Sequence, residues 1–194
     1  MPLSDNTKIL PFDRQGLLNF LPRDSIGAEI GVEQGLFSEL ILSFVKPKKL
    51  YLIDSWIDVM TGKFQNQRET LRQEKNYNEV RKKFQNHLAV EIVRESSENA
   101  SKLFKNNSLD WIYIDADHSY EGVSKDLGTW GEKIKIGGFM CGHDWTTKPT
   151  KKGRVIFGVN RAVEEYILKN KFELIGITNE NNFKSFVLKK IYDQ

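Results

Sequence analysis

The sequence contains little cysteine and no long apolar run. Its single cysteine, Cys141, cannot form a disulfide within the chain, and such sparse cysteine is typical of a protein kept in a reducing cytoplasm. No run of about 18 apolar residues is present, so we expect no transmembrane helix. The opening residues, MPLSDNTKIL, lack the basic start and apolar stretch of a signal peptide. These absences predict a soluble, cytoplasmic protein that does not bind a membrane.

The sequence also lacks a strong charge of either sign. Its net charge is +3 over 194 residues, which is too small to indicate nucleic-acid binding. One short run at 146–154 carries four basic residues and no acid: Lys148, Lys151, Lys152 and Arg154. Such a run is either a solvated loop or a positive rim that attracts acidic ligands to a neighbouring site.

The chain has no internal repeat, and its short apolar runs alternate with segments of helical period. The expected strands are residues 26–32, 49–54, 89–93, 109–115 and 137–142, followed by 172–178 and 183–190. The last two are separated only by NENN, so they should form an antiparallel hairpin. The pattern predicts an α/β, Rossmann-like sheet of seven strands that is mostly parallel, with helices on both faces and this hairpin at the C-terminus.

Residues 1–24 lie outside the repeating pattern, so we expect an N-terminal helical extension and one domain over 25–194. Within the extension, FDRQGLLNFLP predicts a short helix that covers one end of the sheet and stops before Pro22. Further along, Gly137 and Gly138 indicate a turn at the fifth strand.

Two stretches beside the expected strand ends are candidate lids over a binding site, namely 56–78 and 145–157. Four large side chains could line them or belong to the core: Trp56, Met60, Phe64 and Trp145. The spacing of Val80, Phe84 and Leu88 predicts a helix that carries all three in line on one face.

A glycine-containing loop, EIGVEQG at 29–35, follows the first strand. Gly31 would allow a sharp turn, and Gly35 would let a ligand approach the start of the next helix. The dinucleotide fingerprint G-x-G-x-x-G is not met, because Glu33 stands at its middle glycine. Asp54, at the end of the second strand, could accept hydrogen bonds from both hydroxyls of a ribose; a helix cap or a turn is the alternative. Together these residues predict a nucleoside-containing cofactor.

Acids and histidines follow the fourth and fifth strands, in DADH at 115–118 and GHDW at 142–145. If the two strands are neighbours, Asp115, His143 and Asp144 can point into one small space and hold a divalent cation such as magnesium. His118 is then a candidate general base. The alternative is that Asp117 and His118 cap the following helix.

These motifs together, EIGVEQG, YLIDSW, SSENA, IDADHSYEGVSKDL and GGFMCGHDW, resemble the class I S-adenosylmethionine-dependent methyltransferases. Within that class the sequence is similar to the small-molecule O-methyltransferases that include the macrolide-sugar enzymes. The resemblance covers about residues 25 to 190. It implies S-adenosylmethionine as cofactor and a small hydroxylated acceptor, which is acidic if the basic run forms a rim. A homodimer is an open alternative to a monomer.

The resemblance also implies roles for individual residues. The implied cofactor contacts are Glu29, Gly31 and Gly35 at the methionine part, Asp54 at the ribose, Ser96 and Ser97 near the adenine, and also Glu33 and Asp115. In the metal-using members, Asp115 and Asp144 match metal ligands, and His118 matches the base, so His118 and Asp115 are the expected catalytic residues. His143 stands where those members carry an acid, so a softer metal, or none, is the alternative to magnesium.

Three other functions compete with this interpretation. A nicotinamide-dependent oxidoreductase is disfavoured by Glu33 in the glycine loop and by the unexplained acid–histidine cluster. A metal hydrolase would leave Gly31 and Asp54 unexplained. A non-catalytic module that binds the cofactor or an acidic partner stays open.

Overall fold

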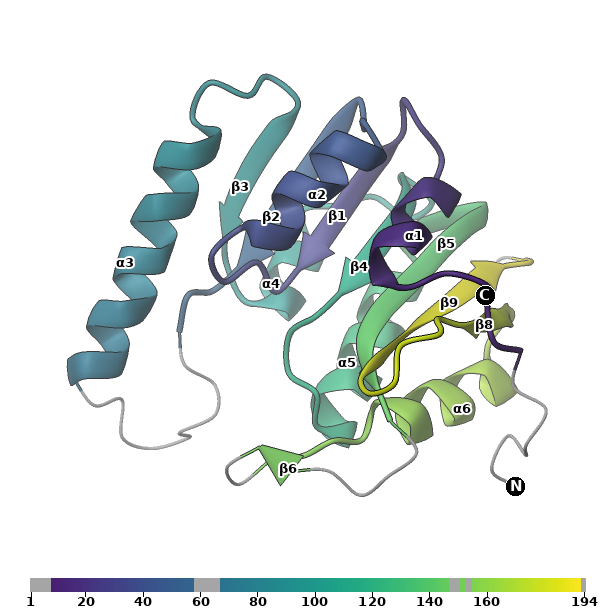
Figure 1. Cartoon of the computed structure of the whole chain (residues 1–194). Coiled ribbons are helices and arrows are strands. Elements are labelled where there is room, and N and C mark those ends of the chain that lie inside the picture. Colours follow the sequence, from purple (N-terminus) through teal and green to yellow (C-terminus); the bar gives the residue numbers. More distant parts are fainter. Residues whose placement is uncertain (1–7, 58–66, 147–150, 153–154, 193–194) are drawn as a thin grey trace.

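The computed structural model describes residues 8–57, 67–146, 151–152 and 155–192. Its main sheet has seven strands in the order β3-β2-β1-β4-β5-β9-β8 (Figure 1). Their bounds are β1 Ile26–Ile30, β2 Lys49–Asp54, β3 Val90–Arg94, β4 Leu109–Ile114, β5 Ile134–Trp145, β8 Phe172–Ile177 and β9 Lys184–Lys190. The first five are parallel, whereas β9 runs antiparallel between β5 and β8. The predicted sheet and its closing hairpin are therefore confirmed.

Helices cover both faces of this sheet. One face carries α1 Arg14–Phe20, α2 Leu36–Phe44 and α3 Gln67–Phe84, and the other carries α4 Ser97–Ser101, α5 Tyr120–Gly131 and α6 Val159–Lys169. Side chains of β4 alternate between the two layers. Trp111 and Tyr113 pack toward the first, while Ile112 and Ile114 pack toward the second. None of the described helices is long and apolar enough to cross a membrane.

Helix α1 forms where the sequence predicts it, but it packs elsewhere. Asp13 caps its first turn by accepting a hydrogen bond from the Gly16 N–H, 2.8 Å. Leu17 and Leu18 are fully buried in the same cluster as Trp111. The expectation that this helix covers one end of the sheet is wrong, because two adjacent leucines anchor it to the face beside α2 (Figure 1).

Strand β5 is longer than predicted. Gly137 has φ +81°, and the pairing with β4 changes register between Leu109 and Trp111. The two glycines therefore form an irregularity inside a continuous strand rather than a turn. Because β5 continues to Trp145, His143 and Asp144 lie in its last residues, where Asp144 adopts a left-handed φ of 62°.

The candidate lid at 56–78 is partly a helix, since α3 begins at Gln67. That helix ends at Phe84, so Leu88 lies beyond it, contrary to the prediction, and is 99% exposed. Trp56 and Trp145 are each 2% exposed, which confirms the core alternative for both. Met60 and Phe64 lie outside the described residues.

The basic run ends in the two-stranded ribbon of β6 Lys151–Lys152 and β7 Val155–Ile156. Lys148 and Arg154 lie outside the described residues, and only the backbone of Lys151 and Lys152 is described. The positive rim therefore stays a prediction.

Candidate active site

The close approach of the ends of β1 and β4 explains why residue 31 is glycine. Gly31 has φ +91°, and a Cβ atom there would lie 2.1 Å from the carbonyl oxygen of Asp115. The Gly31 N–H donates to Ile53 O at 2.9 Å, and the Asp115 N–H donates to Ile30 O at 2.7 Å. The two strand ends thus approach so closely that only glycine fits. This places Gly31 and Asp115 side by side at the carboxyl edge of the sheet.

The rest of the glycine loop is held by contacts with residues from α3 and from the segment after β2. Gly35, with φ +69°, is the N-cap residue just before α2, and a Cβ atom there would lie 2.9 Å from the Phe84 ring. Gly35 is therefore small because α3 packs against it. The exposed Glu33 pairs with Arg72 at 3.3 Å, and its carbonyl oxygen accepts a hydrogen bond from Trp56 Nε1 at 2.9 Å. The loop is thus pinned by a buried tryptophan.

Asp54 lies beneath this loop and supports it. Its Oδ2 accepts hydrogen bonds from the N–H groups of Val32 and Glu33, both at 2.9 Å, and its Oδ1 accepts one from Trp56 N–H at 2.7 Å. A carboxylate offers about four lone-pair positions. The turn predicted as the alternative role of Asp54 is therefore present, and about one position is left for a ligand.

Glu29 lies on β1, before the glycine loop, and its side chain is buried against α2. It is 1% exposed, and its Oε2 accepts a hydrogen bond from the buried Ser38 hydroxyl at 2.5 Å. Burial raises the pKa of Glu29 to about 8. In this conformation, the carboxyl group ties β1 to α2, and its contact with a cofactor stays a prediction.

The two serines after β3 differ in their surroundings. Ser96 is exposed and caps α4, accepting a hydrogen bond from Asn99 N–H at 3.3 Å. The Ser97 hydroxyl donates to Asp126 at 2.5 Å and accepts from Trp130 Nε1 at 2.8 Å. Ser97 thus joins α4 to α5, which leaves Ser96 as the more accessible of the pair.

Three side chains at the exits of β4 and β5 converge, as predicted. One ligand atom from each of Asp115, His143 and Asp144 lies within 4.8 Å of the others. His143 Nδ1 is 3.2 Å from Asp144 Oδ1 and 4.0 Å from Asp115 Oδ1. Because β4 and β5 are neighbours, the chain brings together residues that are 28 positions apart.

His118 is oriented by Asp144. Its Nδ1 lies 3.0 Å from Asp144 Oδ2, and its ring stacks on Phe157 at 4.5 Å with an interplanar angle of 8°. The hydrogen bond to Asp144 raises the pKa of His118. Burial alone would raise the pKa of Asp144, but hydrogen bonds from His118 and His143 hold it well below its usual range.

The helix-capping alternative is wrong for His118. Helix α5 is capped by Ser119, whose hydroxyl accepts a hydrogen bond from Gly122 N–H at 3.0 Å. Asp117 supports that cap, since it accepts a hydrogen bond from the Ser119 N–H at 2.8 Å. Asp117 is therefore a turn residue, while the ring of His118 belongs to the cluster at the sheet edge.

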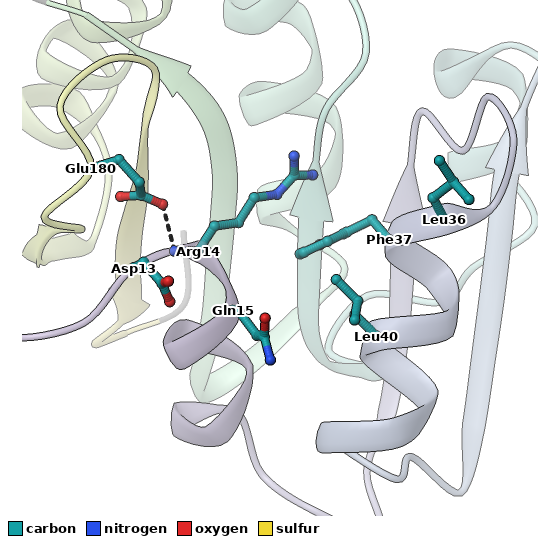
Figure 2. Close-up of a pocket in the computed structure, with 7 residues that line it drawn as sticks. All are labelled: Asp13, Arg14, Gln15, Leu36, Phe37, Leu40 and Glu180. Atoms are coloured by element: carbon teal, nitrogen blue, oxygen red, sulfur yellow. Dashed lines mark hydrogen bonds between the residues drawn. The ribbon is translucent and has the colours of Figure 1, made fainter.

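Sequence reasoning missed one residue of this site. Arg14, at the start of α1, places its Nη2 2.5 Å from Asp115 Oδ2. A pocket of about 370 Å³ opens beside it between α1 and α2 (Figure 2). The pocket is lined by Asp13, Arg14, Gln15, Leu36, Phe37, Leu40 and Glu180. No motif surrounds Arg14, so nothing in the sequence indicates this contact.

The sheet order separates this fold from the nicotinamide-binding one. The doubly wound dinucleotide-binding sheet has the order 3-2-1-4-5-6 with its strands parallel. Here an antiparallel β9 is inserted between β5 and β8. The oxidoreductase alternative does not fit this topology.

Solved structures with the same fold include a methyltransferase, a methylase and a protein with S-adenosylmethionine bound. An S-adenosylmethionine-dependent methyltransferase from Aquifex aeolicus is 16% identical with a TM-score of 0.63, and the match covers 93% of this chain and 90% of that one. Fibrillarin from Aeropyrum pernix, with S-adenosylmethionine bound, is 10% identical with a TM-score of 0.61, covering 90% and 72%. The ribosomal protein L11 methylase from Lactobacillus delbrueckii subsp. bulgaricus is 10% identical with a TM-score of 0.59, covering 92% and 77%.

The family is shown by the sequence itself. No curated protein matches the chain. A family model described as a methyltransferase domain matches residues 28–145, which is more than half of the chain. The protein therefore belongs to this methyltransferase family and has the fold of the class I S-adenosylmethionine-dependent enzymes.

Proposed function

We propose that this chain methylates a hydroxyl group of a small acceptor, using S-adenosylmethionine, with His118 as the base and a divalent cation at Asp115, His143 and Asp144. One observation carries the proposal: the His118–Asp144 hydrogen bond lies at the same sheet edge as the glycine loop at Gly31. The family requires a cofactor site, and this edge supplies a base next to it.

The sheet edge at Gly31 has polar groups that suit the cofactor. The carbonyl oxygens of Gly31 and Asp115 accept no hydrogen bond within the described part of the chain, so they are available to an ammonium group. Asp54 has about one lone pair for a ribose hydroxyl, and the exposed Ser96 is available beyond it. When bound, S-adenosylmethionine supplies a methyl group on a positively charged sulfur.

The cluster also fits a cation. Two carboxylates and an imidazole suit manganese or zinc as well as magnesium. Ligand atoms around one such ion lie up to about 4 Å apart, so the observed 4.8 Å requires a modest contraction. When bound, a cation would lower the pKa of an acceptor hydroxyl.

His118 is arranged to remove the hydroxyl proton. With its Nδ1–H donating to Asp144, the imidazole keeps Nε2 free to accept a proton. Stacking on Phe157 fixes the plane of the ring. The acceptor oxygen would lose its proton to Nε2 and gain the methyl group as the carbon–sulfur bond breaks. Because the pKa of His118 is raised, the base is neutral only toward higher pH.

The nature of the acceptor rests on the surroundings of the site. We expect a small hydroxylated molecule, because the pocket beside Arg14 has an apolar wall from α2 together with polar groups from α1. The basic run at 146–154 favours an acidic acceptor, and its four basic side chains are not among those that the structure describes.

Calorimetry and methyl-transfer assays on the full chain test the proposal. Titration with S-adenosylmethionine and its demethylated product should show binding to the wild type, His118→Ala and the control His87→Ala, whose histidine is exposed after α3. Sugars and phenols are then screened with labelled cofactor, with manganese or with a chelator. His118→Ala should lose about 10²–10⁴ in turnover, whereas His87→Ala should keep it.

Three results would each contradict a different part of the proposal. Absence of cofactor binding would exclude the cofactor site, and near wild-type turnover in His118→Ala would exclude His118 as the base. Turnover that is identical with manganese and with a chelator would exclude a role for the cation and would leave the rest of the proposal unchanged.

A further inference from the structure

A cation of the chain itself already lies on Asp115. Arg14 Nη2 is 2.5 Å from Asp115 Oδ2, and both side chains are about three-quarters buried, with 26% and 22% exposed. Arginine stays charged at all ordinary pH values. One oxygen of the proposed metal ligand is therefore engaged by a guanidinium group from the N-terminal helix.

The position of Arg14 is held from three sides. Its guanidinium lies 3.8 Å from the centre of the Phe37 ring on α2 and 5.1 Å from that of Tyr113 on β4. Its backbone N–H donates to Glu180 Oε1, 2.5 Å, in the connection between β8 and β9. The stacking and the anchored backbone keep the guanidinium over Asp115, so the contact is not that of a freely moving surface side chain.

A divalent cation and this guanidinium would compete for binding to the Asp115 carboxylate. Arg14 holds Oδ2 of Asp115 while Oδ1 faces His143, so both positive groups would share one carboxylate and repel each other across it. We infer that Arg14 is an internal competitor for the divalent cation, so that cation binding releases Arg14 from Asp115. This inference rests on the cation site of the proposed function.

The pocket beside Arg14 offers the released side chain a second partner. Glu180 Oε2 is buried and has no hydrogen-bond partner among the described residues, and the same holds for Arg14 Nε. Both residues line the pocket, and Figure 2 shows the Glu180 carboxylate on the side of the Arg14 backbone opposite to the guanidinium. A released guanidinium would have to turn to this side of the backbone to pair with Glu180 Oε2, and that pairing would spare it from being a buried, unpaired charge.

Manganese titration of the full chain, followed by electron paramagnetic resonance, tests the competition. Arg14→Met keeps an apolar stem over Phe37 and removes the charge, so it should bind manganese about 5–150-fold more tightly than wild type, the usual range for coupled sites. Arg14→Lys should fall between the two. The control Arg23→Met, an exposed arginine of the same N-terminal segment, should match wild type.

Coupling is reciprocal, so manganese should also loosen α1. Hydrogen exchange at the Leu17 and Leu18 amides should become faster with manganese in the wild type, and this response should be absent in Arg14→Met. A purely structural role of Arg14 would change exchange in the variant but would not create a dependence on manganese.

The outcomes separate this inference from the proposed function. Equal or weaker manganese binding in Arg14→Met, or in Arg14→Lys where the methionine variant does not fold, would overturn the competition and leave the cation site standing. No manganese binding to any variant would overturn both the competition and the cation site. Cofactor binding, measured in the same samples, reports on the methyltransferase proposal independently.

Discussion

Replacing the buried Glu29 by glutamine should change how stability depends on pH. Glu29 is 1% exposed, and burial raises its pKa from 4.5 to about 8. Between these values the unfolded chain has released the proton while the folded chain still holds it. The contribution of Glu29 to stability is therefore full below about pH 4.5 and is lost as the pH rises through about 8.

The size of this loss follows from the separation of the two pKa values. Each pH unit within the window costs about 1.4 kcal/mol, so the wild type should lose on the order of 3 kcal/mol between pH 5 and pH 8 through Glu29. Glutamine does not ionise, although its second amide hydrogen is buried without a partner at a cost of about 1–3 kcal/mol at every pH. The free energy of unfolding of Glu29→Gln minus that of wild type should thus rise by about 3 kcal/mol from pH 5 to pH 8.

Urea unfolding followed by tryptophan fluorescence at pH 5, 6, 7 and 8 measures this difference, with unchanged m-values as the condition for comparing free energies. Glu173→Gln is the matched control, because Glu173 is an exposed glutamate on strand β8. If Glu29→Gln and Glu173→Gln show the same pH dependence, the carboxyl group of Glu29 is not held protonated by burial, and the reasoning fails.

Two further predictions concern the strand exits. Gly31→Ala should lower the free energy of unfolding by at least about 2 kcal/mol, because its Cβ would meet Asp115 O at a positive φ; Gly128→Ala, with nothing within 4 Å, should gain about 0.5–1 kcal/mol, and equal effects in urea unfolding would contradict this. In metal-free protein, the hydrogen bond to Asp144 raises the pKa of His118, so its stabilisation is full below pH 6.5 and is lost above the folded pKa. His118→Asn should therefore lower the melting temperature more at pH 5.5 than at pH 9, and equal losses would exclude the charged pair.

The sheet could be predicted because its strands carry their own signals. In β4 the side chains from Trp111 to Ile114 are buried against helices on both faces of the sheet. A strand that is buried on both faces has a continuous apolar sequence rather than an alternating one. The short link between the last two strands leaves no room for a crossover. The gathering of Asp115 with Asp144 followed from this sheet alone, because parallel neighbours end at the same edge.

What could not be predicted depends on distant packing. Gly137 has a positive φ but lies inside β5, where the pairing with β4 changes register. A pair of glycines in the sequence is equally typical of a turn, so the sequence does not distinguish the two structures. The contact of Arg14 with Asp115 spans 101 positions in the chain and depends on where α1 docks. The same holds for Ser97, whose hydroxyl is taken by Asp126 from a later helix.

Asp54 links the predicted cofactor contact to the structure of the loop. The sequence predicted a ribose partner after β2, and the structure uses about three lone pairs of that carboxylate for backbone N–H groups of the loop and the turn. A ligand that donates one hydroxyl fits the remaining position. A ligand that donates two must displace one backbone donor, which costs about 1.5–3 kcal/mol for a hydrogen bond to a charged group. A ligand bound at Asp54 would therefore be coupled to order in the glycine loop, because both would depend on the same two oxygen atoms.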